Sequence, residues 1–150
     1  CSADGRDQSM KVEILMPGKI ADKPYQKLVE LYLERCSRRL PVEIINCRNE
    51  DEILRRLNGR ECIIALDEHA RCRNTQDFCQ WLEQKINSGV NRMTFCLGAA
   101  EGHDPRVRAS AGEFISLSPL TLNHQLALLV LAEQLYRAVS IMFGEPYHKA

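Results

Sequence analysis

Short apolar runs alternate with longer amphipathic stretches along almost the whole chain. The apolar runs predict strands at residues 12–16, 42–47, 62–66, 93–97 and 114–117. Between and after them, apolar residues recur at helical spacing, which predicts helices at about 23–38, 49–57, 75–86, 105–111 and 124–142. This alternation predicts an α/β fold with a mostly parallel, five- or six-stranded sheet and helices on both faces.

The last predicted helix has an unusual composition. Residues 126–132 are all apolar, so this part of the helix has no polar face. A helix that is apolar on every side must be covered on every side, and one sheet covers only one of them. We therefore expect a second copy of the chain to cover the other side, giving a homodimer. The alternative is that loops of the same chain cover it.

Composition limits the class of protein. The chain has 150 residues, of which 45% are hydrophobic, and its 20 Lys and Arg balance its 20 Asp and Glu. An intrinsically disordered chain and a strongly basic nucleic-acid-binding protein are both disfavoured, so any RNA binding would depend on a local patch. Residues 1–9 are polar and aperiodic, and we expect them to be a tag or flexible extension before a single domain at 10–150.

Cellular location follows from the same survey. The sequence shows no secretory signal, and its longest apolar run is too short for a membrane span, so a cytoplasmic protein is expected. The seven cysteines are irregularly spaced and contain no C-x-x-C pair. Several fall in or beside apolar strands, which predicts reduced, mostly buried thiols rather than disulfides or a metal site.

Ligands of open parallel sheets bind beyond the carboxyl ends of the strands. Three segments occupy such ends here: 66–68, 98–102 and 116–121. The middle segment is bounded by Gly98 and Gly102, which would let backbone amides approach a ligand closely. It contains neither a G-x-G-x-x-G nor a G-x-x-x-x-G-K-[ST] pattern, so a dinucleotide fold and a P-loop are disfavoured.

The carboxyl-terminal region carries a second group of reactive side chains. Glu133 and Arg137 are four residues apart and can pair across one helical turn. The tail then contains Tyr147, His148 and Lys149, which together offer a stacking ring, a titratable imidazole and a cation. A frayed terminus without function is the alternative from these residues alone.

Several ordered motifs give the chain a family resemblance. They are S-L-S-x-x-T at 116–121, H-Q-L at 124–126, E-Q-L-Y-R-A at 133–138, P-Y-H at 146–148, Leu66-Asp67, and Phe95 to Gly102. Together these motifs resemble the RlmH-type large-subunit ribosomal RNA methyltransferases, which belong to the SPOUT class of trefoil-knotted enzymes. The similarity covers about 140 residues, from Met10 to the end.

The resemblance implies a function that periodicity alone could not. It implies a homodimer that uses S-adenosylmethionine to methylate N3 of a pseudouridine in 23S rRNA on the assembled ribosome. It implies no metal, no membrane and no DNA. The implied cofactor-binding residues are Leu66, Gly98, Ala99, Gly102, Leu117, Ser118, Pro119, Leu120, Thr121, Leu122 and Asn123.

The resemblance also implies residues near the target base. These are His124, Arg137, Tyr147 and His148, with the tail of one subunit completing the pocket of the other. His148 is the candidate base for the N3 proton, Arg137 would stabilise developing negative charge, and Tyr147 would stack on the base or hydrogen-bond to it.

Two departures from the family pattern motivate a second hypothesis. Ala99 stands where the family usually has Gly, and Leu128 stands where it usually has Arg. The alternative function is therefore a catalytically weak SPOUT paralogue that binds the ribosome or another partner without methyl transfer.

Overall fold

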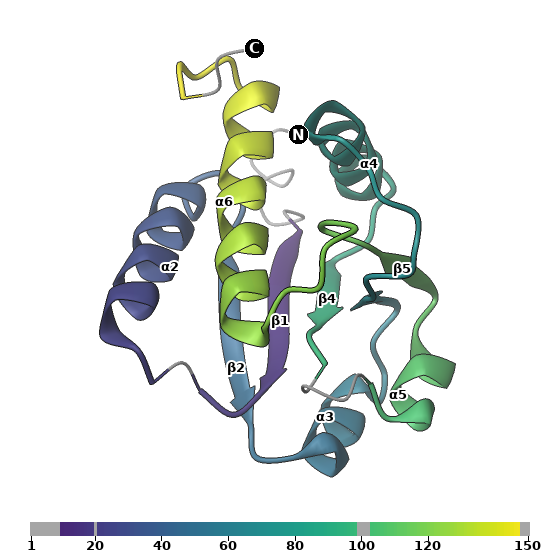
Figure 1. The fold of residues 1–150 in the computed structure, drawn as a ribbon. Helices are drawn as coiled ribbons and strands as arrows, with labels where there is room; N and C mark the ends of the chain where they lie inside the picture. Colours follow the sequence, from purple (N-terminus) through teal and green to yellow (C-terminus); the bar gives the residue numbers. More distant parts are fainter. Residues whose placement is uncertain (1–9, 20, 99–102, 148–150) are drawn as a thin grey trace.

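Five parallel strands form one twisted sheet at the centre of the molecule (Figure 1). The computed structural model describes residues 10–19, 21–98 and 103–147. Within them the strand order is β2-β1-β4-β3-β5. The strands are β1 (Lys11–Pro17), β2 (Val42–Cys47), β3 (Cys62–Leu66), β4 (Arg92–Cys96) and β5 (Glu113–Ile115). The predicted α/β class and parallel sheet are confirmed, with five strands in the described residues.

Helices cover both faces of this sheet, as the alternating pattern predicted. They are α2 (Lys23–Cys36), α3 (Glu50–Leu57), α4 (Thr75–Asn87), α5 (Pro105–Ser110) and α6 (His124–Met142). The larger apolar core joins the sheet to α2, α4 and α6, and a smaller one joins its other face to α3 and α5. Neighbours on β1 show the division: Ile14 lies in the larger core and Leu15 in the smaller.

Asparagine caps determine where three of the helices begin. Asn49, Asn74 and Asn123 precede α3, α4 and α6, and each side-chain oxygen accepts a hydrogen bond from a backbone N–H in the first turn. These contacts satisfy amides that have no partner inside the helix. The Asn123 cap fixes the junction between segment 116–123 and α6.

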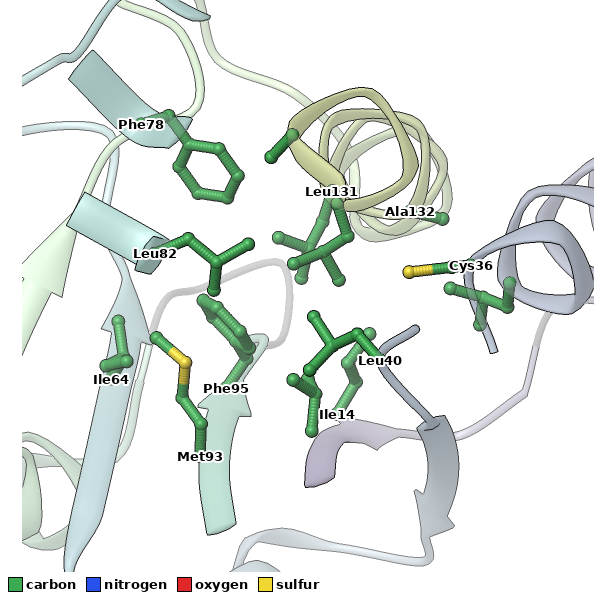
Figure 2. Close-up of a cluster of buried hydrophobic side chains, with 14 of the residues drawn as sticks. Ile14, Cys36, Leu40, Ile64, Phe78, Leu82, Met93, Phe95, Leu131 and Ala132 are labelled. Atoms are coloured by element: carbon green, nitrogen blue, oxygen red, sulfur yellow. The ribbon is translucent and has the colours of Figure 1, made fainter. Parts of the chain in front are cut away.

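Helix α6 lies across the larger core, between α2 and α4 (Figure 1). Figure 2 shows its Leu131 directed towards Leu82 and Phe95, and its Ala132 facing Cys36. By length and composition alone α6 could cross a membrane, but its inner side packs on the sheet as the core helix of an α/β domain does. Only 39% of its most apolar window is buried within one chain, so the rest of that window has no full cover from this chain.

The described cysteines are free, as predicted. Cys36, Cys47, Cys62, Cys79 and Cys96 are buried, and Cys72 is exposed. Burial raises the pKa of Cys96 to about 12, which keeps this thiol protonated and unreactive at neutral pH. The extension predicted at residues 1–9 lies outside the described residues, and both the domain limits and the knot remain predictions.

Candidate functional site

A cavity of about 760 Å³ opens beyond the carboxyl ends of β3, β4 and β5. Its volume lies within the range typical of small-molecule sites. Its walls come from the three segments that follow these strands and from the first turn of α6. The lining residues are Leu66, Asp67, Glu68, His69, Leu97, Gly98, His103, Arg108, Leu117, Ser118, Leu120, Thr121, Leu122, Asn123, His124 and Ala127.

The segment between β5 and α6 is held in shape by its own serines. The Ser116 hydroxyl donates to the Ser118 carbonyl oxygen at 2.8 Å, and the Leu120 backbone N–H donates to Ser118 Oγ at 2.9 Å. These local bonds fold the segment back over the cavity, where leucine side chains form apolar walls. A wall of this kind, with ordered backbone and few charges, suits a nucleoside-like ligand.

Most of the predicted cofactor residues meet at this one cavity. Leu66, Gly98, Leu117, Ser118 and residues 120–123 line it. His124, which the family resemblance places near the target base, lines it as well. Pro119 belongs to the same turn but is not among the lining residues, and Ala99 and Gly102 lie outside the described residues. The assignment of these residues to a cofactor remains a prediction.

Charged side chains also line the cavity. Asp67 accepts hydrogen bonds from the His69 backbone N–H at 2.9 Å and from Arg108 Nη1 at 2.8 Å, which lower the pKa of its carboxyl group. The Thr121 hydroxyl donates to Glu68 Oε2 at 2.5 Å, joining the β3 end to the segment after β5. The strand-end rule places Asp67 and Glu68 at this edge, and α5 brings Arg108 to Asp67.

A separate cluster forms at the far end of α6. The Glu133 carboxylate accepts hydrogen bonds from Arg137 Nε at 3.0 Å and from the Tyr147 hydroxyl at 2.9 Å. The Arg137 guanidinium lies 4.8 Å from the centre of the Tyr147 ring. Burial tends to raise the pKa of Glu133, but these hydrogen bonds outweigh it, and the pKa is lowered. The predicted Glu133–Arg137 pair is thus confirmed and also holds Tyr147.

The cavity and this cluster occupy different parts of α6 within one chain. His124 begins α6 and Arg137 lies thirteen residues later, so at 1.5 Å per residue the two are about 20 Å apart along the helix. Neither Arg137 nor Tyr147 lines the cavity. His148, the candidate base, lies outside the described residues.

Of the two departures from the family pattern, Leu128 lies within the described residues and Ala99 does not. The side chain of Leu128 is buried in the larger core, with 1% of its surface exposed. A residue that contacts RNA would need to be accessible, and Leu128 is not accessible in this chain. Arg106 and Arg108 near the cavity pair with acidic side chains, Arg106 with Asp51 and Asp104. Their charges are therefore partly balanced within the chain.

Known proteins resemble this chain along almost its whole length. A family model described as "Predicted SPOUT methyltransferase" matches residues 10–148. The protein named ribosomal RNA large subunit methyltransferase H from Phenylobacterium zucineum is 37% identical over 153 aligned residues, covering 93% of this chain and 99% of that protein. The protein of the same name from a strain of Thermus thermophilus is 40% identical over 121 residues, covering 81% of this chain and 85% of that protein.

Solved structures agree on the fold. The crystal structure of a probable methyltransferase from Bordetella pertussis Tohama I superposes with a TM-score of 0.52 at 13% identity, covering 93% of this chain and 99% of that one. At this identity the likeness establishes the fold alone. With the family model spanning nearly all of the described residues and relatives above 30% identity covering most of the chain, this protein belongs to the SPOUT methyltransferase family.

Proposed function

We propose that the chain methylates N3 of a pseudouridine in 23S rRNA, acting as a homodimer on the assembled ribosome in the cytoplasm. S-adenosylmethionine is the methyl donor of this family. Relatives named ribosomal RNA large subunit methyltransferase H support the choice of substrate class. The observation that carries the proposal is the cavity at the ends of β3, β4 and β5, where nearly all described residues of the predicted cofactor site meet.

The cavity fits the donor by shape and by chemistry. Leu66, Leu117 and Leu122 provide apolar walls for the adenine, while the backbone of segments 66–69 and 116–123 provides polar groups at its edges. The donor supplies an electrophilic methyl group on a sulfonium. The chain's contribution is to hold that donor and the target base in line and at close approach, which removes much of the entropic part of the barrier.

Residues of the carboxyl-terminal region, including the cluster of Glu133, Arg137 and Tyr147 (the tail cluster), supply the groups needed to methylate the nucleobase. N3 of the target nucleobase must lose its proton, and His148 is our candidate for the general base that accepts it. Arg137 would stabilise the negative charge that develops on the carbonyl oxygens, and Tyr147 would stack on the base or donate a hydrogen bond to it. His124, in the first turn of α6, lines the cavity, and we expect it to contact the target nucleobase from the donor side.

The proposed homodimer brings these two parts together. The chain's own Arg137 lies about 20 Å along α6 from its own His124, so we infer that the complementary tail comes from a second copy. The incompletely buried side of α6 offers the contact surface, with Leu129 and Val130 only partly buried. Leu28 and Leu31 on α2 add exposed apolar surface, with 43% and 38% of their surfaces accessible.

The test uses ribosomes that lack the modification. Wild-type protein should bind S-adenosylmethionine in calorimetry and transfer a tritiated methyl group to 23S rRNA in those ribosomes. Mass spectrometry of the nucleosides should then identify N3-methylpseudouridine. Donor binding without any transfer to ribosomes or free rRNA would contradict the proposal and favour the catalytically weak paralogue.

A further inference from the structure

His103 is a lining residue of the cavity that none of the family motifs explains. It is half-buried and follows the 98–102 segment directly. Its Nε2 atom lies 2.8 Å from the carbonyl oxygen of Leu66. A carbonyl oxygen can only accept, so Nε2 carries a proton and donates to it. This bond links the carboxyl end of β3 to the start of the segment that leads into α5.

A buried acidic side chain interacts electrostatically with His103. Glu50, in the first turn of α3, has both carboxylate oxygens buried, and within the described residues neither has a hydrogen-bond partner at ordinary geometry. Burial raises the pKa of Glu50, and the electrostatic interaction with His103 is the strongest influence that opposes this.

The residues after His103 are bonded to α3, the helix that carries Glu50. Asp104 caps α5 by accepting a hydrogen bond from the Arg106 backbone N–H, and Arg106 Nη2 donates to Asp51 Oδ1 at 3.0 Å. Residues 103–106 are therefore attached to β3 on one side, through Leu66, and to α3 on the other. We call residues 103–106 the strap.

We propose that His103 is a positioning residue of the donor cavity: its imidazole, bonded to the Leu66 carbonyl, fixes the Leu66 wall against the strap. This inference rests on the proposed function, since it assigns the cavity to S-adenosylmethionine. Among the described residues, Leu66 is the only residue of β3 that lines the cavity. Loss of the His103 bond would free its carbonyl and let the two sides of the cavity separate.

Two substitutions of similar polarity separate this role from general stability. Gln at position 103 places its side-chain amide N–H near the position of Nε2, whereas Asn is shorter by one methylene and falls short of the Leu66 carbonyl. His103→Asn should weaken binding of S-adenosylmethionine about five- to tenfold, as expected for one lost hydrogen bond, and His103→Gln should stay within about twofold. The methyl-transfer rate at saturating donor should change little, so the effect appears in KM and not in kcat.

The role of Glu50 has its own comparison. Glu50→Gln keeps the size of the side chain but removes its charge, and should weaken donor binding about two- to threefold. Glu43→Gln, at an exposed position of β2, is the matched control and should leave binding unchanged. Because the proposed effect is positional, S-adenosylhomocysteine, whose sulfur is neutral, should lose affinity by the same factor in each variant.

Each outcome has a defined meaning. Wild-type protein that fails to bind the donor would contradict the proposed function itself. If wild type binds and His103→Asn and His103→Gln bind equally well, or both lose affinity in step with a lowered melting temperature, the positioning role is wrong. A loss confined to S-adenosylmethionine, with S-adenosylhomocysteine unaffected, would show a direct charge effect and also overturn it.

Discussion

Glu133 shows how one side chain can organise several functional groups. It accepts hydrogen bonds from Arg137 and Tyr147, and its other oxygen accepts one from Gln134 Nε2 at 2.8 Å. The Arg137 pairing followed from the i,i+4 spacing in the sequence. The Tyr147 contact did not, because the chain turns after α6 and no periodicity reports where a tail returns. The same limit explains why His103 was missed, since its partner Leu66 lies 37 residues earlier.

The lowered pKa of Glu133 predicts a specific dependence of stability on pH. A carboxyl group whose pKa is lower in the folded state stabilises that state above its unfolded pKa, near 4.5 here, and loses this contribution as the pH falls through the folded value. Glu133→Gln should therefore be less stable than wild type at pH 7, with the difference shrinking towards about pH 3.5. Urea unfolding at both pH values measures it, with Glu43→Gln as control. A difference in unfolding free energy that stays constant with pH would contradict the lowered pKa of Glu133.

At the scale of elements, sequence periodicity located every helix and strand of the described residues to within about three residues. Strands β2 and β3 begin and end where the apolar runs do, and β3 is covered on both faces as its apolar composition predicted. The order of the strands could not be predicted in this way. β4 lies between β1 and β3, and that arrangement depends on how the helices pack over the sheet rather than on any one segment.

The packing of α6 on the sheet gives a prediction at this scale. The side chain of Leu131 is fully buried in the larger core, whereas 71% of the Leu120 surface is exposed. Leu131→Ala should lower the free energy of unfolding by about 3 kcal/mol, because it removes buried methyl groups and leaves a cavity. Leu120→Ala should change it by less than about 0.5 kcal/mol. Denaturant unfolding of both variants provides the comparison, and similar values for the two would show that α6 does not depend on this core.

For the whole molecule, the separation between cavity and tail cluster is the dominant feature. Sequence reasoning placed both at functional sites, but it could not give the distance between them, which depends on a single uninterrupted helix. With His124 at one end of α6 and Arg137 near the other, the proposed function gives each chain two different half-sites. A closed, two-fold dimer would pair each half-site with its complement, giving two complete sites for two chains.

Mixed dimers test this arrangement directly. Arg137→Ala damages the tail half-site, and Gly98→Trp fills the donor half-site, so each homodimer should be nearly inactive. A heterodimer purified through two different affinity tags should recover about half of the wild-type rate, because one of its two shared sites combines an intact cavity with an intact tail. Methyl transfer to unmodified ribosomes measures the rate, and circular dichroism checks that both variants fold. If each site were completed within one chain, every site in the heterodimer would carry one defect and the mixture would stay inactive.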